Sequence, residues 1–131
     1  MKAKNIQRVA LIGGGVIGSG WATRCLVHGL SVVVTDPSPA AAEMVLKTVD
    51  SAWPILEEAG LGEKADRSKL EFAPDIETAV ADADFVQENV PEREDLKIAV
   101  HEEIGRHAKG DIVVASSSSG LLPSRLQSRC R

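Results

Sequence analysis

The chain has 131 residues, 44% of them hydrophobic and 26% charged, which is typical of one globular domain and excludes a disordered protein. Its net charge is −4, so we expect neither a nucleic-acid partner nor an anionic membrane surface. No apolar run approaches the ~18 residues of a membrane span. The two cysteines, Cys25 and Cys130, have neither disulfide-framework nor metal-ligand spacing, so we expect reduced thiols, no metal site and a cytoplasmic location.

The first part of the chain predicts two buried strands joined by a helix. Residues 8–12 and 30–35 are short apolar runs, the second rich in β-branched side chains. Between them Ile17, Trp21 and Cys25 follow one another at intervals of four. This spacing predicts a helix, in which Trp21 contributes to packing and Cys25 is a buried thiol.

A long helix should follow the second strand. Ser38 suits the N-cap position and Pro39 the first helical position, and the helical pattern continues toward Gly60. Pro54 lies inside this pattern. Because a proline removes a backbone donor and its ring clashes with the preceding turn, we expect a kink or a break there.

The remainder predicts three further strands, at residues 70–73, 85–90 and 112–115, and two helices, at 76–80 and 92–107. Strands that alternate with helices indicate a parallel sheet. We therefore predict a Rossmann-type α/β fold, a doubly wound parallel sheet with helices on both faces, formed by the chain as one domain.

A glycine-rich segment separates the first strand from the first helix. Gly13, Gly15 and Gly18 form a G-x-G-x-x-G pattern. In that pattern the first glycine permits a tight turn, the second lets a diphosphate approach the backbone, and the third lets the helix pack on the strand. The residues that we expect to contact a dinucleotide here are Gly13, Gly14, Gly15, Val16, Ile17 and Gly18.

An acidic residue ends the second strand. Asp36 lies 18 residues beyond Gly18, close to the spacing of about 20 at which a carboxylate binds the adenosine ribose. The carboxylate would repel a 2′-phosphate, and Pro37 follows it in place of an arginine, so NAD is favoured over NADP. A glycine turn beside a solvated aspartate is the structural alternative. FAD proteins and adenosyl-methionine methyl transferases have similar turns, but this chain shows no β-meander insertion of the FAD kind.

Three segments in order resemble one family. Residues 9–21 resemble the opening of the 3-hydroxyacyl-CoA dehydrogenase family, 83–92 its fourth strand and the turn after it, and 115–124 its fifth strand and serine loop. Within the family, Gln-Glu-Asn-Val-Pro-Glu-Arg at 87–93 and Ser-Gly-Leu-Leu-Pro-Ser at 119–124 are most similar to the L-carnitine dehydrogenase branch. The λ-crystallin (gulonate dehydrogenase) branch is second.

The resemblance implies NAD-dependent oxidation of the 3-hydroxyl of a small hydroxy acid, L-carnitine to 3-dehydrocarnitine in the first case and a 3-hydroxyacyl-CoA or gulonate in the alternatives. It also implies that Glu92 and Lys97 lie near the nicotinamide half of the cofactor, and that Ser119 approaches the reacting hydroxyl as a catalytic residue. Ser117 and Gly120 stand where the acyl-CoA branch usually has Asn and Ser, which disfavours an acyl-CoA substrate.

The resemblance further implies that the catalytic histidine lies about twenty residues beyond the serine loop, past Arg131. We therefore expect an NAD-binding domain at 1–131, with a helical substrate and dimerisation domain outside this chain and a homodimer in the full-length enzyme. A non-catalytic dinucleotide-binding module is the alternative of another class. Glu92 also fits a first helical turn, where the helix dipole favours acids, and Lys97 has an equally plain structural interpretation. We interpret the three histidines as structural: His28, His101 and His107.

Overall fold

The computed structural model describes residues 6–117. Its strands are β1 (Arg8–Ile12), β2 (Ser31–Thr35), β3 (Leu70–Phe72), β4 (Phe85–Glu88) and β5 (Val113–Ser116). Its helices are α1 (Val16–Val27), α2 (Ala40–Ala59), the short 3₁₀ helix η1 (Arg67–Lys69), α3 (Ile76–Val80) and α4 (Glu94–His107). All strand pairs are parallel, in the order β3-β2-β1-β4-β5, and the prediction of a Rossmann-type fold is confirmed.

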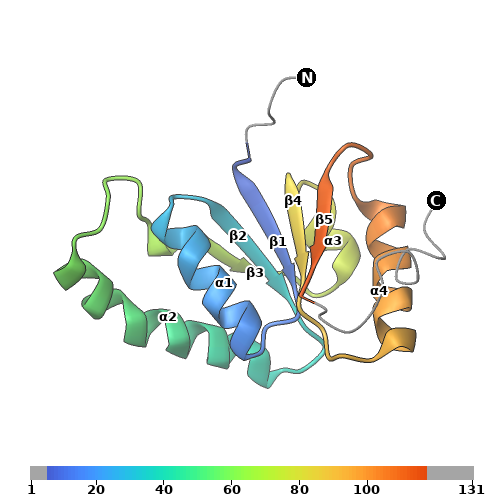
Figure 1. Cartoon of the computed structure of the whole chain (residues 1–131), viewed down its shortest axis with the longest axis horizontal. Helices are drawn as coiled ribbons and strands as arrows, with labels where there is room; N and C mark the ends of the chain where they lie inside the picture. Colours follow the sequence, from blue (N-terminus) through green and yellow to red (C-terminus); the bar gives the residue numbers. More distant parts are fainter. Residues whose placement is uncertain (1–5, 118–131) are drawn as a thin grey trace.

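Each face of the sheet carries its own pair of helices. Figure 1 shows α1 and α2 on one side and α3 and α4 on the other. The side chains of β1 alternate accordingly: Val9 and Leu11 pack with α1 and α2, whereas Ala10 and Ile12 pack with α3 and α4. Because both faces are covered, the central strands read as continuous apolar runs without a polar side.

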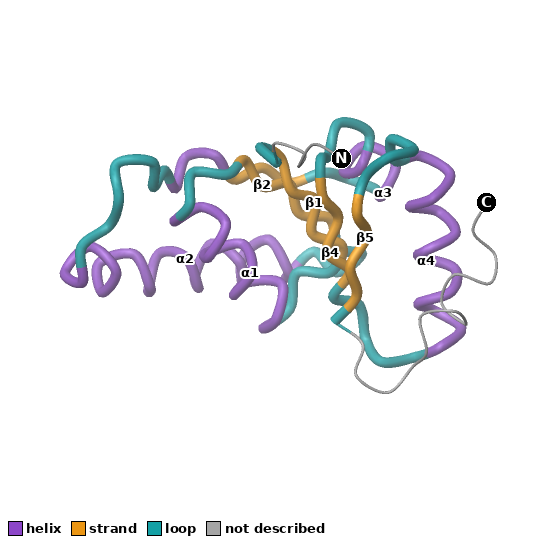
Figure 2. Tube along the Cα trace, turned by 45° about the horizontal axis from the view of Figure 1, so that its top comes forward, coloured by secondary structure: helices purple, strands orange, loops and turns teal. Residues whose placement is uncertain are grey.

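The strand order brings the carboxyl ends of three strands together. Ile12 at the end of β1 is in register with Thr35 of β2 on one side and with Glu88 of β4 on the other. The chain first adds β2 and β3 on one side of β1 and later adds β4 and β5 on the other side. Figure 2 shows the strands between the two helical layers. Open α/β sheets bind ligands at such a reversal of strand order, outside the carboxyl ends.

The packed face of α1 differs from the predicted one. Its buried side includes Gly18, Ala22 and Leu26, whereas Ile17 and Trp21 are exposed, Trp21 by 39%. The predicted packing of Trp21 is therefore wrong, although Cys25 is buried as expected. Small residues face inward because α1 begins close to the end of β1, and this orientation turns the larger apolar side chains outward.

The start of α2 also differs from the prediction. Pro39, not Ser38, is the N-cap residue, and no side chain caps the helix. Ser38 instead donates its backbone N–H to Asp36 Oδ1 at 2.8 Å. The helix is continuous through Pro54, where we predicted a kink or a break. Its buried stripe packs α2 against α1 and the sheet and ends at Trp53, directly before the proline.

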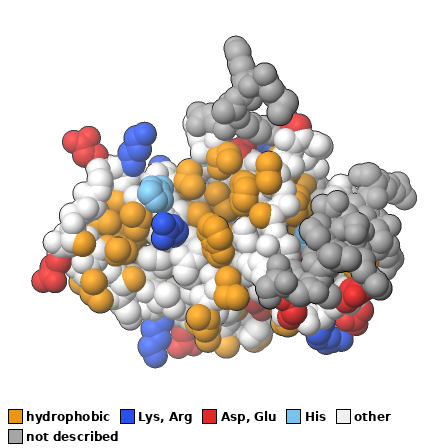
Figure 3. Space-filling view, viewed as in Figure 1, with side chains coloured by type: hydrophobic (Ala, Val, Ile, Leu, Met, Phe, Trp, Pro, Cys, Tyr) orange, Lys and Arg blue, Asp and Glu red, His pale blue; other side chains and the backbone are white. Residues whose placement is uncertain are grey.

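Within residues 6–117 no helix is both long enough and apolar enough to cross a membrane. Figure 3 shows apolar side chains toward the middle of the face viewed in Figure 1 and charged side chains mostly at its periphery. Large apolar residues that are exposed include Val16, Ile17 and Val113.

Candidate functional site

A cavity of about 770 Å³ opens at the carboxyl ends of the strands, between the start of α1, the start of α3 and one side of α4. Seven of the residues predicted to bind a cofactor line it: Gly13, Gly15, Val16, Ile17, Asp36, Glu92 and Lys97. Gly14 and Gly18 do not line it. Ser119, the predicted catalytic residue, lies outside the described residues.

Two of the glycines are required by close backbone approaches. Gly13 has φ = +101°, and a Cβ there would lie 2.9 Å from the main-chain carbonyl of Asn89. A Cβ on Gly18 would lie 2.2 Å from the carbonyl oxygen of Gly13. Only glycine fits both positions. Gly18 therefore does not line the cavity, but it allows α1 to start directly against the end of β1.

The first turn of α1 presents uncapped backbone amides. Gly15 is the N-cap, no side chain accepts from the first turn, and that turn contains no acidic residue. A Cβ on Gly15 would meet no protein atom within 4 Å, so the approach to these amides is open. A helix N-terminus with free N–H groups attracts phosphate through hydrogen bonds and through the helix dipole. Gly14, in contrast, packs against Ala41 and Val45 of α2.

Asp36 is held in a fixed orientation at the end of β2. Its Oδ2 accepts from the backbone N–H of Gly14 at 2.7 Å and its Oδ1 from that of Ser38 at 2.8 Å. Each carboxylate oxygen accepts about two hydrogen bonds, so both retain capacity for ribose hydroxyls. Among the cavity-lining residues that the structure describes, Lys97 is the sole Lys or Arg, and none lies at the Asp36 end to receive a 2′-phosphate.

A buried carboxylate, Glu88, lies behind the opposite wall of the cavity. Lys97 Nζ donates to its Oε2 at 2.6 Å, and His101 Nε2 lies 3.0 Å from its Oε1. Ser116 Oγ donates to the same Oε1 at 2.6 Å, and the backbone N–H of Val90 donates to Oε2 at 2.8 Å. Burial alone would raise the pKa of Glu88; the hydrogen bonds from His101, Lys97 and Ser116, with the charge of Lys97, outweigh it and lower the pKa to about 2.

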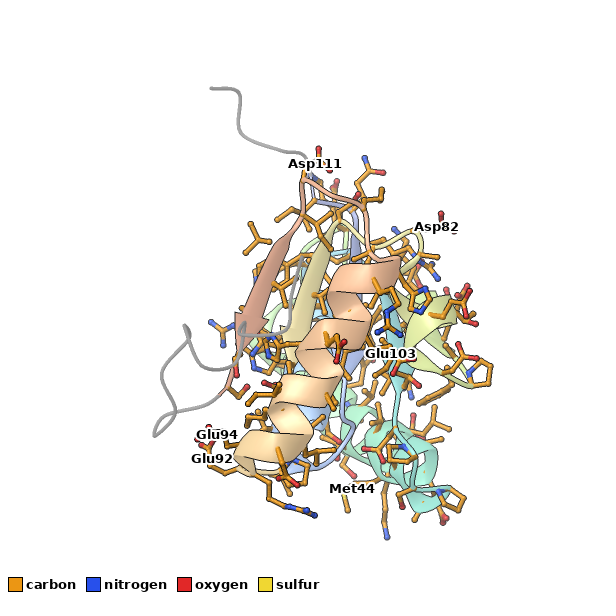
Figure 4. All side chains as sticks on the ribbon, turned by 90° about the vertical axis from the view of Figure 1, so that its right-hand side faces the viewer. Met44, Asp82, Glu92, Glu94, Glu103 and Asp111 are labelled. Carbon is orange, nitrogen blue, oxygen red and sulfur yellow. The ribbon has the colours of Figure 1, made fainter. Side chains whose placement is uncertain are left out.

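Glu92 stands before α4 rather than inside it. The helix begins at Glu94, so the acids of its first turn are Glu94 and Asp95, and the prediction of a helix from Glu92 is wrong at that end. Between β4 and this helix the backbone N–H of Val90 donates back to the carboxylate of Glu88. Glu92 Oε1 lies 3.9 Å from Lys97 Nζ. Figure 4 shows Glu92 and Glu94 near the start of α4.

A second hydrogen-bonded group joins the ends of β4 and β5. Gln87 Nε2 donates to Ser117 Oγ at 2.9 Å, and Ser117 Oγ donates to Asn89 Oδ1 at 2.5 Å. Both Asn89 and Ser117 line the cavity. Sequence reasoning did not assign Asn89 or Glu88. The available signal was a strand whose buried run ends in the polar pair Gln87 and Glu88.

Two of the three histidines lie beside a glutamate. His101 is buried and bonded to Glu88, and His107 lies 4.0 Å from Glu77. None of the three histidines lines the 770 Å³ cavity. Within residues 6–117 no group of His, Cys, Asp and Glu side chains could hold a metal ion.

Comparison with known proteins agrees with this geometry. Residues 8–131 match the family described as 3-hydroxyacyl-CoA dehydrogenase, NAD binding domain. The chain belongs to this family. It is 52% identical over 124 residues to an L-carnitine dehydrogenase of Burkholderia mallei, covering 95% of this chain and 39% of that protein. An L-carnitine dehydrogenase of Bacillus cereus is 47% identical over 131 residues, 100% of this chain and 40% of the relative. The chain thus spans about two fifths of the length of these relatives.

Solved structures of the family have the same fold. The (S)-3-hydroxybutyryl-CoA dehydrogenase PaaH1 from Ralstonia eutropha superposes with a TM-score of 0.83 at 27% identity, covering 96% of this chain and 46% of that one. NAD is the cofactor of the domain family. The open glycine turn, the uncapped start of α1 and the oriented Asp36 fit that cofactor, since they supply amide donors for a diphosphate and acceptors for a ribose.

Proposed function

We propose that residues 1–131 form the NAD-binding domain of a longer dehydrogenase that oxidises the 3-hydroxyl of a small hydroxy acid. For the substrate we propose L-carnitine, with 3-dehydrocarnitine as the product. The observation that carries the proposal is the cavity in which the uncapped start of α1 and the carboxylate of Asp36 face one ligand space. The names of relatives that are about half identical to this chain support carnitine over gulonate and over a 3-hydroxyacyl-CoA.

The strand order gives the cofactor a direction. The diphosphate binds at the end of β1, on the amides of the first turn of α1, and the adenosine ribose binds Asp36 at the end of β2. Asn89, Glu92 and Lys97, at the end of β4 and the start of α4, would then hold the nicotinamide nucleoside. When bound, NAD accepts a hydride at its nicotinamide ring.

The chain's own contribution is to bind and orient the two substrates. From the resemblance to the family's serine loop we infer that Ser119, three residues beyond the end of β5 in the sequence, holds the reacting hydroxyl. For the proton acceptor we propose a histidine outside the described residues, since no histidine lines the cavity within residues 6–117. A cytoplasmic location and a homodimer of the full-length enzyme stay predictions.

A non-catalytic role is the second candidate for these 131 residues taken alone, favoured by the same lack of a histidine in the described lining of the cavity. Calorimetry with NAD and a turnover assay with NAD and L-carnitine separate the candidates. We expect the 131-residue chain to bind NAD without turnover, and the longer protein encoded by the same reading frame to reduce NAD with L-carnitine. Absence of NAD binding by this chain would remove both candidates. Turnover with gulonate or a 3-hydroxyacyl-CoA, but not with L-carnitine, would replace the substrate.

A further inference from the structure

The buried cluster around Glu88 is more than an ion pair. Glu88 is 0% exposed, Lys97 1% and His101 6%. The three side chains come from β4 and α4, and Ser116 joins them from β5. Such a cluster costs desolvation energy, and replacement by apolar residues of similar volume is often neutral or stabilising. Stability alone is therefore a weak reason for its presence.

The cluster fixes the orientation of the Glu88 carboxylate completely. Oε2 accepts from Lys97 Nζ and from the backbone N–H of Val90, and Oε1 accepts from Ser116 Oγ and contacts His101 Nε2. With its pKa lowered to about 2, Glu88 is ionised at neutral pH and acts as an acceptor only. His101 must therefore carry a proton on Nε2 and donate it. Both oxygens then have two donors each, which leaves the carboxylate no alternative orientation of equal energy.

Lys97 connects this cluster to the cavity. Its ammonium has three donors; one binds Glu88, and the side chain forms part of the cavity wall with Glu92 3.9 Å away. The position of Nζ depends on Glu88, which is its partner at hydrogen-bond distance. Lys97 and His101 are four residues apart and so lie on the same face of α4. Both side chains reach the carboxylate of Glu88 at the end of β4. A change at His101 therefore reaches the cavity through the carboxylate.

We propose that His101 is a positioning residue for the cofactor: its Nε2–H locks the Glu88 carboxylate, and Glu88 holds the Lys97 ammonium where it donates to the carboxamide oxygen of the nicotinamide ring. This inference rests on the proposed function, because it assumes that NAD occupies the cavity. Without the His101 donor, Oε1 loses one of its two partners and the carboxylate turns toward the donors that remain. Lys97 Nζ then moves from its place in the wall, while the glycine turn and Asp36 are unaffected.

A pair of ligands separates positioning from a general loss of structure. ADP-ribose contains the adenosine, the diphosphate and a ribose but lacks the nicotinamide ring. A variant that only weakens the fold lowers the affinity for NAD and ADP-ribose equally. A variant that misplaces Lys97 lowers the affinity for NAD more than for ADP-ribose.

The test compares three variants of this chain by calorimetry. His101→Leu removes the donor at similar volume, and His101→Gln keeps an N–H donor at nearly the same reach. His107→Leu, on the same helix but away from the cavity, is the matched control. We expect His101→Leu to weaken NAD binding about tenfold, which corresponds to one hydrogen bond, and ADP-ribose binding less than threefold. His101→Gln should recover most of the difference, and His107→Leu should bind both ligands like the wild type.

The other outcomes contradict the inference in distinct ways. Equal losses for NAD and ADP-ribose, or unchanged affinity for both, would show that His101 has no positioning role. If His101→Leu does not fold, Ser116→Ala removes the other donor to the same oxygen and must show the same selective loss. If the wild type binds neither ligand, the proposed function itself has failed. If it binds both and the variants show no selectivity, the failure concerns His101 alone.

Discussion

The two walls of the cavity are built in opposite ways. The wall at β1 and α1 is made of backbone: a glycine turn and helix amides with no side chain to cap them. The wall at β4 and α4 rests on side chains, and the carboxylate behind it has every acceptor site occupied. The free amides of α1 and the fully hydrogen-bonded carboxylate of Glu88 indicate that the two walls have different functions. The first wall is left incomplete for a ligand, whereas the second fixes a charged group before the ligand arrives.

We expect the largest loss of stability and of NAD binding when a side chain is added at Gly18. Gly18→Ala would place a Cβ 2.2 Å from the carbonyl oxygen of Gly13, so α1 must move away from β1. We expect a loss of about 3 kcal/mol or more in the free energy of unfolding and no measurable NAD binding, by urea denaturation and calorimetry. Gly20→Ala is the control: a Cβ there meets nothing within 4 Å, and the higher helix propensity of alanine should stabilise α1 by up to about 1 kcal/mol. Similar results for both variants would contradict the close approach.

The Glu88 cluster should make the free energy of unfolding depend on pH in the acid range. The pKa of Glu88 is lowered to about 2 from 4.5, so its ionised form stabilises the folded chain above the usual pKa. That stabilisation is lost as the pH falls from about 5 to about 2. Glu88→Gln should destabilise the chain by about 3 kcal/mol at pH 7, and the difference from the wild type should shrink over this acid range.

The control for that measurement is Glu71→Gln. Glu71 forms a surface ion pair with Arg8, and its side chain is 63% exposed. Exposed pairs contribute about 0–1 kcal/mol, so this variant should follow the wild type at every pH. Thermal or urea unfolding across the pH range gives both curves. A difference between wild type and Glu88→Gln that stays constant down to pH 2 would contradict the assigned ionisation of Glu88.

Asp36 accepts from the backbone amides of Gly14 and Ser38 and keeps acceptor capacity for a ligand. Asp36→Ala should weaken NAD binding about tenfold to a hundredfold, since hydrogen bonds to a charged group contribute about 1.5–3 kcal/mol. It should also bring the affinities for NAD and NADP closer together, because the repulsion of a 2′-phosphate disappears. Calorimetry with both cofactors measures the two effects. Asp75→Asn removes a charge from the same cavity while asparagine still caps α3, and it should change NAD binding less than threefold. A change as large as that of Asp36→Ala would point to general electrostatics.

The difference between the walls also explains what the sequence could predict. Gly13, Gly18 and Asp36 belong to one strand–helix–strand unit, so their spacing alone indicates a backbone site and a ribose acceptor. The Glu88 cluster draws on β4, α4 and β5. Its assembly depends on the strand register that pairs Glu88 with Ser116 and on which side of α4 faces the sheet.

The errors have the same origin. The interval of four placed Trp21 on the packed side of α1, but the contact between Gly18 and Gly13 decides which side faces the sheet. Ser38 is a good N-cap by type, yet its backbone N–H is engaged by Asp36 and the helix begins after Pro39. Local propensity gave way in both cases to contacts between elements.

The most direct measurement of the central claim is an amide NMR titration of this chain with NAD. Diphosphate binding at the start of α1 predicts the largest chemical-shift changes at the backbone amides of Gly15, Val16 and Ile17, which the helix leaves without a side-chain cap. Amides at the far end of α2, around Gly60, should not move. Saturating NAD that leaves the amides of residues 15–17 unchanged, or shifts them no more than those near Gly60, would contradict the account.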